Sequence, residues 1–322
     1  MPLSTDDSVN KTADHLVKAM RGAFNTPETH RPAHARGHLL RGTFTPSSEA
    51  SKLSSAPHFK NKSTKILARF SSSTGLKDIP DTDANANPRG FAVRFLLSED
   101  EHKHTDIVAH STRFFPMRTG EGFLALLSAL GNGTAGEFLG ANPSAKAFVE
   151  DPKPSPESFA TEIYYGVNAF KLVSADGKGT FVRYRILPAL GLHTLSEPDL
   201  KSKGPNYLFD ELPQRLENGP VEFKLTAQVA KDGDVTDDAT VHWPEDREVV
   251  ELGTIKLDTF ESTEQNEKEQ KKIIFDPVPR VEGVEPSDDP LLDMRAAVYL
   301  ISGKGRRAAK PDAEAVDHAA VA

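Results

Sequence analysis

The chain of 322 residues is 37% hydrophobic and 27% charged, proportions typical of a soluble globular protein with a sizeable core. Its net charge of -8 argues against nucleic acid as a partner, and the absence of cysteine excludes disulfides, thiolate ligation of a metal and cysteine nucleophiles. Because there is no run of about 18 apolar residues and no basic start before a long apolar core, we expect no membrane span, no secretory signal and a cytoplasmic location.

An amphipathic helix is predicted over residues 6–24, where apolar residues from Val9 to Met20 recur with a period near 3.6. Ser4 or Asp6 can cap its start, and Pro27 follows its end. A segment dense in histidine and arginine covers residues 30–42. Short stretches rich in β-branched or aromatic residues then predict strands over 42–45, 65–71, 90–96 and 105–108.

The second part of the chain mixes helices and strands. Helical spacing of apolar residues predicts a helix over 122–130. Residues 168–173 and 180–186 form a predicted hairpin, because the Asp176-Gly177 step between them favours a tight turn. Further strands are expected over 221–230 and 249–257, and further helices over 209–216 and 291–302.

Strands that come early and helices that come late predict an α+β fold with a mostly antiparallel sheet, which could close into a barrel. No internal repeat or linker divides the chain. We therefore expect a single domain over residues 1–322, with residues 1–28 as an N-terminal helical arm and residues 308–322 as a flexible tail.

Arg295 and Tyr299 lie four residues apart on a predicted helix, so both side chains share one face. A guanidinium beside a phenol favours the phenolate, which is a hard anionic donor suited to ferric iron. Arg306 lies two turns beyond and could bind a carboxylate of a cofactor. An arginine packed along a helix beside a half-buried tyrosine is the commoner meaning of the pattern alone.

His34 follows Arg31 in the basic segment. A histidine can take a proton from one atom and return it to another, and Ser71 could fix its tautomer if it lay near. Arg31 could bind a carboxylate. A solvated basic loop is the alternative. A zinc site of His30, His34 and His38 is disfavoured because Pro32 interrupts the helix that would align them.

Two further positions are ambiguous from pattern alone. Arg69 sits between apolar residues of a strand, so it either faces solvent or neutralises a buried anion. Phe123 is most simply a core residue. No P-loop and no GxSxG motif are present.

From about His30 to Arg306, eight segments in order resemble the haem catalases. They are RPAHARG (31–37), ILARFSS (66–72), NANPRGFAVRF (85–95), RFFPMRTGEGF (113–123), VNAFKLVSADGKGTFVRYR (167–185), VHWPEDREVVELGTIKL (241–257), IFDPVPRVEGVEPSDDP (274–290) and LLDMRAAVYL (291–300). The resemblance implies an antiparallel β-barrel with flanking helices around a buried haem b.

The resemblance also implies a role for each candidate residue. His34 is the distal catalytic histidine, Ser71 orients it, and Phe123 flanks the haem. Tyr299 is the axial iron ligand, and Arg295 keeps it deprotonated. The remaining arginines, Arg31, Arg69 and Arg306, bind the haem propionates.

Two departures qualify the resemblance. The chain stops soon after the ligand helix, which is similar to the mini-catalase or catalase-related peroxidase branch. Where catalases carry a distal asparagine, the sequence reads VAHSTR, with His110 or Ser111 at that place. The asparagine helps to hold peroxide, so its absence weakens fast dismutation, and His110 could offer another donor or acceptor.

These features predict a haem peroxidase of the oxidative stress response, with hydrogen peroxide or an organic hydroperoxide as substrate and a small organic reductant as electron donor. Three alternatives are a true catalase, a lipid hydroperoxide-rearranging enzyme of the allene oxide synthase kind, and a haem-free barrel that binds another ligand. Ala33, before the histidine, does not discriminate between them. Assembly into a homo-oligomer is left open.

Overall fold

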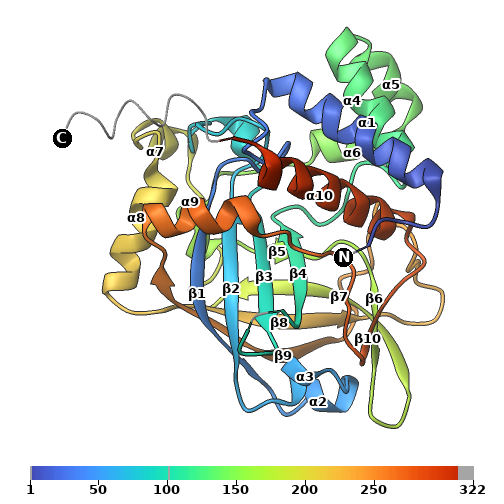
Figure 1. The fold of residues 1–322 in the computed structure, drawn as a ribbon, viewed down its shortest axis with the longest axis vertical. Coiled ribbons are helices and arrows are strands. Elements are labelled where there is room, and N and C mark those ends of the chain that lie inside the picture. The colour runs from blue at the N-terminus through green and yellow to red at the C-terminus, as the bar shows by residue number, and fades with distance from the viewer. Residues whose placement is uncertain (1, 101, 311–322) are drawn as a thin grey trace.

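The computed structural model describes residues 2–100 and 102–310. At its centre, eight antiparallel strands lie in the order β7-β5-β4-β3-β2-β1-β9-β8, and pairing of β8 with β7 closes the ring (Figure 1). The strands are β1 (Gly37–Pro46), β2 (Thr64–Ser71), β3 (Gly90–Leu96), β4 (His104–His110), β5 (Tyr164–Tyr165), β7 (Gly179–Pro188), β8 (Val221–Val229) and β9 (Val249–Phe260). The expected antiparallel barrel is confirmed.

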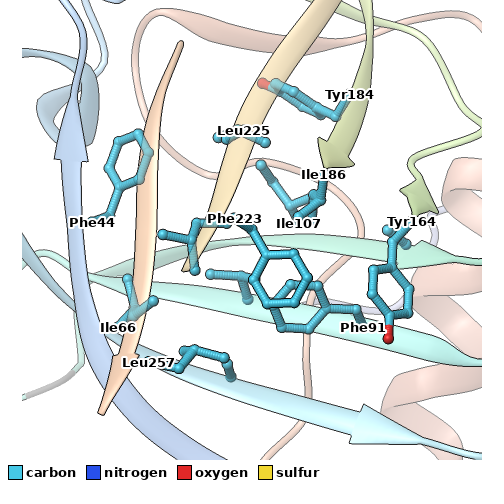
Figure 2. Close-up of a cluster of buried hydrophobic side chains, with 14 of the residues drawn as sticks. Phe44, Ile66, Phe91, Ile107, Tyr164, Tyr184, Ile186, Phe223, Leu225 and Leu257 are labelled. Carbon is cyan, nitrogen blue, oxygen red and sulfur yellow. The ribbon is translucent and has the colours of Figure 1, made fainter. Parts of the chain in front are cut away.

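The inside of the barrel is filled by apolar side chains that alternate along its strands (Figure 2). Phe70 and Phe91 stack at 4.4 Å between ring centroids, and Phe223 packs against both rings. Tyr164 lies among them, with its hydroxyl donating to the carbonyl of Phe159 at 2.9 Å. The described interior is therefore occupied by side chains of the protein itself.

Three helices cover one end of the barrel: α1 (Asp7–Phe24), α4 (Gly120–Asn132) and α10 (Pro290–Ala308) (Figure 1). Asp6 caps α1, and Asp289 caps α10, where Pro290 occupies the first turn without the loss of a hydrogen bond. The apolar face of α1 packs on α10 and α4. The expected N-terminal arm therefore packs outside the barrel, on helices of its own chain.

The other elements are α2 (Ala50–Leu53), α3 (Pro57–Lys60), α5 (Ala135–Ala141), α6 (Pro143–Glu150), β6 (Phe170–Val173), α7 (Glu197–Lys201), α8 (Tyr207–Glu217), α9 (Thr263–Lys272) and β10 (Val284–Pro286), with two short 3-10 turns. The hairpin of β6 and β7 forms as predicted. Several elements were not predicted, among them α9, whose ten residues are all polar and carry no apolar period.

Two further expectations concern the C-terminal tail and the presence of a membrane-spanning helix. The predicted tail over 308–322 is described only as far as Lys310, and the rest lies outside the described residues. Within 2–100 and 102–310, no helix combines the length and the apolar character that crossing a membrane requires.

Candidate functional site

Three residues of the site form one row across the barrel wall. Gly90 on β3 pairs directly with Ser71 on β2 and with His110 on β4. Residues that pair directly across antiparallel strands point to the same face. Since the neighbouring Phe70 and Phe91 belong to the interior core, this row faces outward.

His34 lies against the middle of the row. A Cβ atom at Gly90 would lie 2.5 Å from Ser71 Oγ and 2.9 Å from His34 Nδ1, so only glycine leaves room for the ring. His34 Nδ1 lies 3.1 Å from Ser71 Oγ. The backbone of His34 has φ of 53°, a conformation that residues other than glycine rarely adopt and that surrounding contacts must hold.

Arg69 makes some of the contacts that hold the backbone of His34 in this conformation. Its Nη2 atom donates to the backbone carbonyls of His34 at 3.0 Å and Ala35 at 3.2 Å. Burial lowers the pKa of His34 to about 4, helped by the charges of Arg69 and Arg31. At neutral pH the ring is therefore uncharged and able to accept a proton.

His110 lies beyond Gly90 on the side opposite Ser71. Burial lowers its pKa to about 3, and Arg295 and His34 are the next causes, so those two groups lie near it. Its Nδ1 atom accepts from the backbone N–H of Thr112 at 3.3 Å, and the Thr112 hydroxyl lies 2.6 Å from the same atom. The neighbouring Ser111 instead accepts from the backbone N–H of Arg89 at 2.9 Å. Of the two residues expected at this place, His110 is therefore the one in the row.

Three buried or half-buried arginines meet beside this row. Arg31 and Arg69 donate to Oε1 of Gln270, while Arg31 and Arg306 donate to the carbonyl of Ile273. Within the described part of the chain, none of the three arginines has a carboxylate within ion-pair distance. Burial lowers the pKa of each of them, and repulsion among them adds to the effect on Arg31 and Arg69. An anion bound beside these three cations would offset their mutual repulsion and the cost of burying their charges.

A second group of residues comes from α10. Arg295 donates to the phenol oxygen of Tyr299 from Nε at 3.3 Å and from Nη2 at 3.2 Å. The third nitrogen of Arg295 donates to Asn168 Oδ1, and Asn168 Nδ2 donates to Asp289 at 2.8 Å. Among the described residues the phenol oxygen only accepts hydrogen bonds, and both come from Arg295.

Phe123 lies in the first turn of α4. Its ring centroid is 5.1 Å from that of Phe115, and the side chain packs in the apolar cluster that includes Val298 and Tyr299. Phe123 and Tyr299 therefore pack against the same apolar cluster of α1 and α10.

A family model described as catalase matches residues 23–310. The chain belongs to the catalase family. A catalase-related peroxidase of Mycolicibacterium paratuberculosis is 36% identical over 94% of this chain and 97% of its own length. A catalase-related peroxidase of Synechococcus elongatus is 29% identical over 90% of this chain and 87% of its own.

Solved catalases share the fold at greater sequence distance. A bacterial catalase is 24% identical with a TM-score of 0.74, over 95% of this chain and 62% of that one. Catalase A from Saccharomyces cerevisiae is 22% identical with a TM-score of 0.74, over 90% of this chain and 63% of that one. These comparisons confirm the predicted catalase-like fold and a haem-dependent oxidoreductase of the catalase and peroxidase type that acts on peroxide.

The residues present fit a haem. Within residues 2–100 and 102–310, Arg306 Nε is buried without a hydrogen-bond partner, and the arginine cluster has no anion of the kind that the carboxylates of a haem would supply. Because Gly90 has no side chain, there is room for the His34 ring beside it. A phenol oxygen that only accepts hydrogen bonds is a suitable iron ligand. The donor set of this catalase family member therefore matches an anionic, iron-bearing porphyrin.

Four contributors were missed by sequence reasoning. Gln270 gathers the arginines, Asn168 links Arg295 to Asp289, and Thr112 holds His110. Gln270 carries no sequence signal, because its helix is uniformly polar. Gly90 could have been found, since a glycine at the start of a strand often marks a close approach.

Proposed function

We propose that this protein is a haem-dependent peroxidase that reduces hydrogen peroxide or an organic hydroperoxide with electrons from a small organic donor. The observation that carries the proposal is the presence in one structure of an uncharged His34, a Tyr299 phenol bound by Arg295, and three arginines with no carboxylate partner among the described residues. Relatives matched over 97% and 87% of their own length are named catalase-related peroxidases, which supports the choice.

We propose haem b as the cofactor. Tyr299 would bind its iron, Arg31, Arg69 and Arg306 would bind its carboxylates, and Phe123 would pack beside the porphyrin. The chain has no cysteine, so thioether attachment of the porphyrin is excluded. When bound, haem supplies an iron that binds peroxide and the two electrons that break its O–O bond.

The protein residues would then handle the proton and the ligand geometry. His34 takes the proton of the bound hydroperoxide on Nε2 and returns it to the leaving oxygen, so that water or an alcohol departs. Ser71 holds Nδ1, which keeps the ring oriented. Arg295 donates two hydrogen bonds to the Tyr299 oxygen and so would hold it in position for the iron.

An absorption spectrum tests the cofactor and a pair of assays tests the reaction. The purified protein, expressed with adequate haem, is expected to show a Soret band that changes on addition of peroxide. Oxidation of a dye donor is expected to exceed oxygen release from hydrogen peroxide. A protein that takes up no haem would be a barrel of another function, and rapid oxygen evolution would make it a true catalase.

Three expectations stay predictions. They are a single catalase-like domain over the chain, a cytoplasmic location and assembly with further copies of itself.

A further inference from the structure

The hydrogen bond from the backbone N–H of Thr112 assigns the ring nitrogen of His110 that carries the proton. The backbone N–H of Thr112 points to Nδ1 at 3.3 Å, and the hydroxyl of Thr112 lies 2.6 Å from the same atom. A backbone N–H can only donate, so Nδ1 must accept. A neutral imidazole that accepts at Nδ1 carries its proton on Nε2.

The Nε2–H group of His110 is left for a ligand. Both hydrogen bonds of His110 are made by Nδ1, and within residues 2–100 and 102–310 no protein acceptor binds Nε2. The low pKa of about 3 keeps the ring uncharged, so it offers one donor and no free lone pair. In the sheet, His110 pairs directly with Gly90, the residue against which His34 Nδ1 lies.

We propose that Thr112 is a positioning residue that makes His110 a hydrogen-bond donor only, and that His34 and His110 form an acceptor and donor pair matched to one hydroperoxide. This inference rests on the proposed function. His34 receives the proton, while His110 Nε2–H donates to the oxygen on which negative charge grows.

The same tautomer limits what the site does with a second peroxide. Oxidation of hydrogen peroxide to oxygen requires its protons to be accepted, and a side chain with both an N–H donor and a carbonyl acceptor could assist at each stage. In this tautomer the lone pair of His110 Nδ1 accepts from the backbone N–H of Thr112, so the ring has no lone pair to offer to peroxide. Donor oxidation is therefore favoured over oxygen release.

Fluoride provides a test that does not depend on turnover, because bound fluoride accepts hydrogen bonds and donates none. In the ferric, haem-loaded protein we expect His110→Leu to weaken fluoride binding by about tenfold, the loss of one hydrogen bond to a charged acceptor. Thr112→Val should weaken it by about threefold, since the backbone N–H remains. Thr112→Ser keeps the hydroxyl and should bind fluoride as the parent does.

A second variant tests the claim that His110 only donates. His110→Asn keeps an N–H donor and adds a carbonyl, so fluoride affinity should stay near that of the parent while the ratio of oxygen release to dye oxidation rises severalfold. Unchanged fluoride affinity in His110→Leu would overturn the donor role. An unchanged ratio in His110→Asn would overturn the limit on oxygen release.

These outcomes are separable from failure of the proposed function. If the parent protein takes up no haem, the proposed function fails before fluoride is added. If it takes up haem normally and all variants bind fluoride alike, only the role assigned to His110 and Thr112 fails.

Discussion

Arg295 is bound to the phenol oxygen of Tyr299 on one side and to Asn168 on the other. The first contact lies within α10, and the second joins α10 to the barrel segment before β6. Asp289, which caps α10, holds the amide of Asn168 in turn. The orientation of the candidate iron ligand thus depends on the docking of the helix against the barrel, and not on the helix alone.

The first prediction concerns the ligand itself. Tyr299→Phe removes the phenol oxygen proposed to bind the iron, so haem uptake should fall by more than about tenfold or the ferric spectrum should shift. Absorption spectra of purified parent and variant measure both outcomes. Tyr184→Phe, which changes a buried tyrosine in the barrel interior, is the control and should keep the parental spectrum. A Tyr299→Phe protein with that spectrum would refute the ligand assignment.

The second prediction separates binding from stability in the arginine cluster. Arg306→Gln removes one cation that repels Arg31 and Arg69, so the haem-free protein should melt at the same temperature or higher. Haem affinity should fall by about tenfold, because one charged donor to a carboxylate is lost. Calorimetry of the haem-free protein and haem titration measure the two effects.

Arg307→Gln is the matched control for that pair of measurements. Arg307 is the next residue of α10, is exposed and donates to the carbonyl of Lys272. It should leave haem affinity unchanged. Loss of stability in Arg306→Gln with unchanged haem affinity would mean that the cluster is structural.

The third prediction uses Gly90. Gly90→Ala would place a methyl group 2.5 Å from Ser71 Oγ and 2.9 Å from His34 Nδ1, so the histidine must move. Haem should still bind through α10, while the rate of reaction with peroxide falls by about a hundredfold or more, as expected for a misplaced proton acceptor. Stopped-flow spectra of the ferric protein mixed with peroxide report this rate.

Gly131→Ala provides the comparison, since a Cβ there meets nothing within 4 Å and alanine favours the helix. It should react as fast as the parent. A Gly90→Ala protein that also reacts at the parental rate would show that the position of His34 is not critical.

The sequence predicted those parts of the site that local geometry determines. Arg295 and Tyr299 share a helix face because four residues separate them, and the strand ending at Ser71 was predicted to within one residue. The alignment of Ser71, Gly90 and His110 in one row could not be predicted from local geometry, because strand register depends on the closed barrel.

Other parts depend on contacts between distant segments. Gln270 reaches Arg69 across 201 residues of sequence, from a helix without apolar periodicity. The tautomer of His110 is set by the local turn at Thr112, which became visible only when the strand end was placed. The lowered pKa of His34 requires the folded cluster of arginines and its burial, which composition does not indicate.

The last prediction concerns stability against pH. Helix α3, which carries His58, lies at the end of the barrel away from α10 (Figure 1). The His58 ring packs against Phe59 and Phe95, and its Nδ1 atom is buried without a hydrogen-bond partner among the described residues. Burial lowers its pKa to about 3. Between pH 6 and 4 the unfolded chain therefore binds a proton that the folded protein refuses, so the free energy of unfolding falls with falling pH.

His58→Phe should remove this difference in proton binding between the folded protein and the unfolded chain. The slope of the free energy of unfolding against pH, measured by urea denaturation between pH 6 and 4.5, should decrease by about 1.4 kcal/mol per pH unit. Stability at pH 7 should hold or rise, because a buried nitrogen without a partner is replaced by carbon. Haem uptake should not change, since α3 is remote from the site. A variant with the parental slope would show that the folded protein protonates His58 as readily as the unfolded chain does.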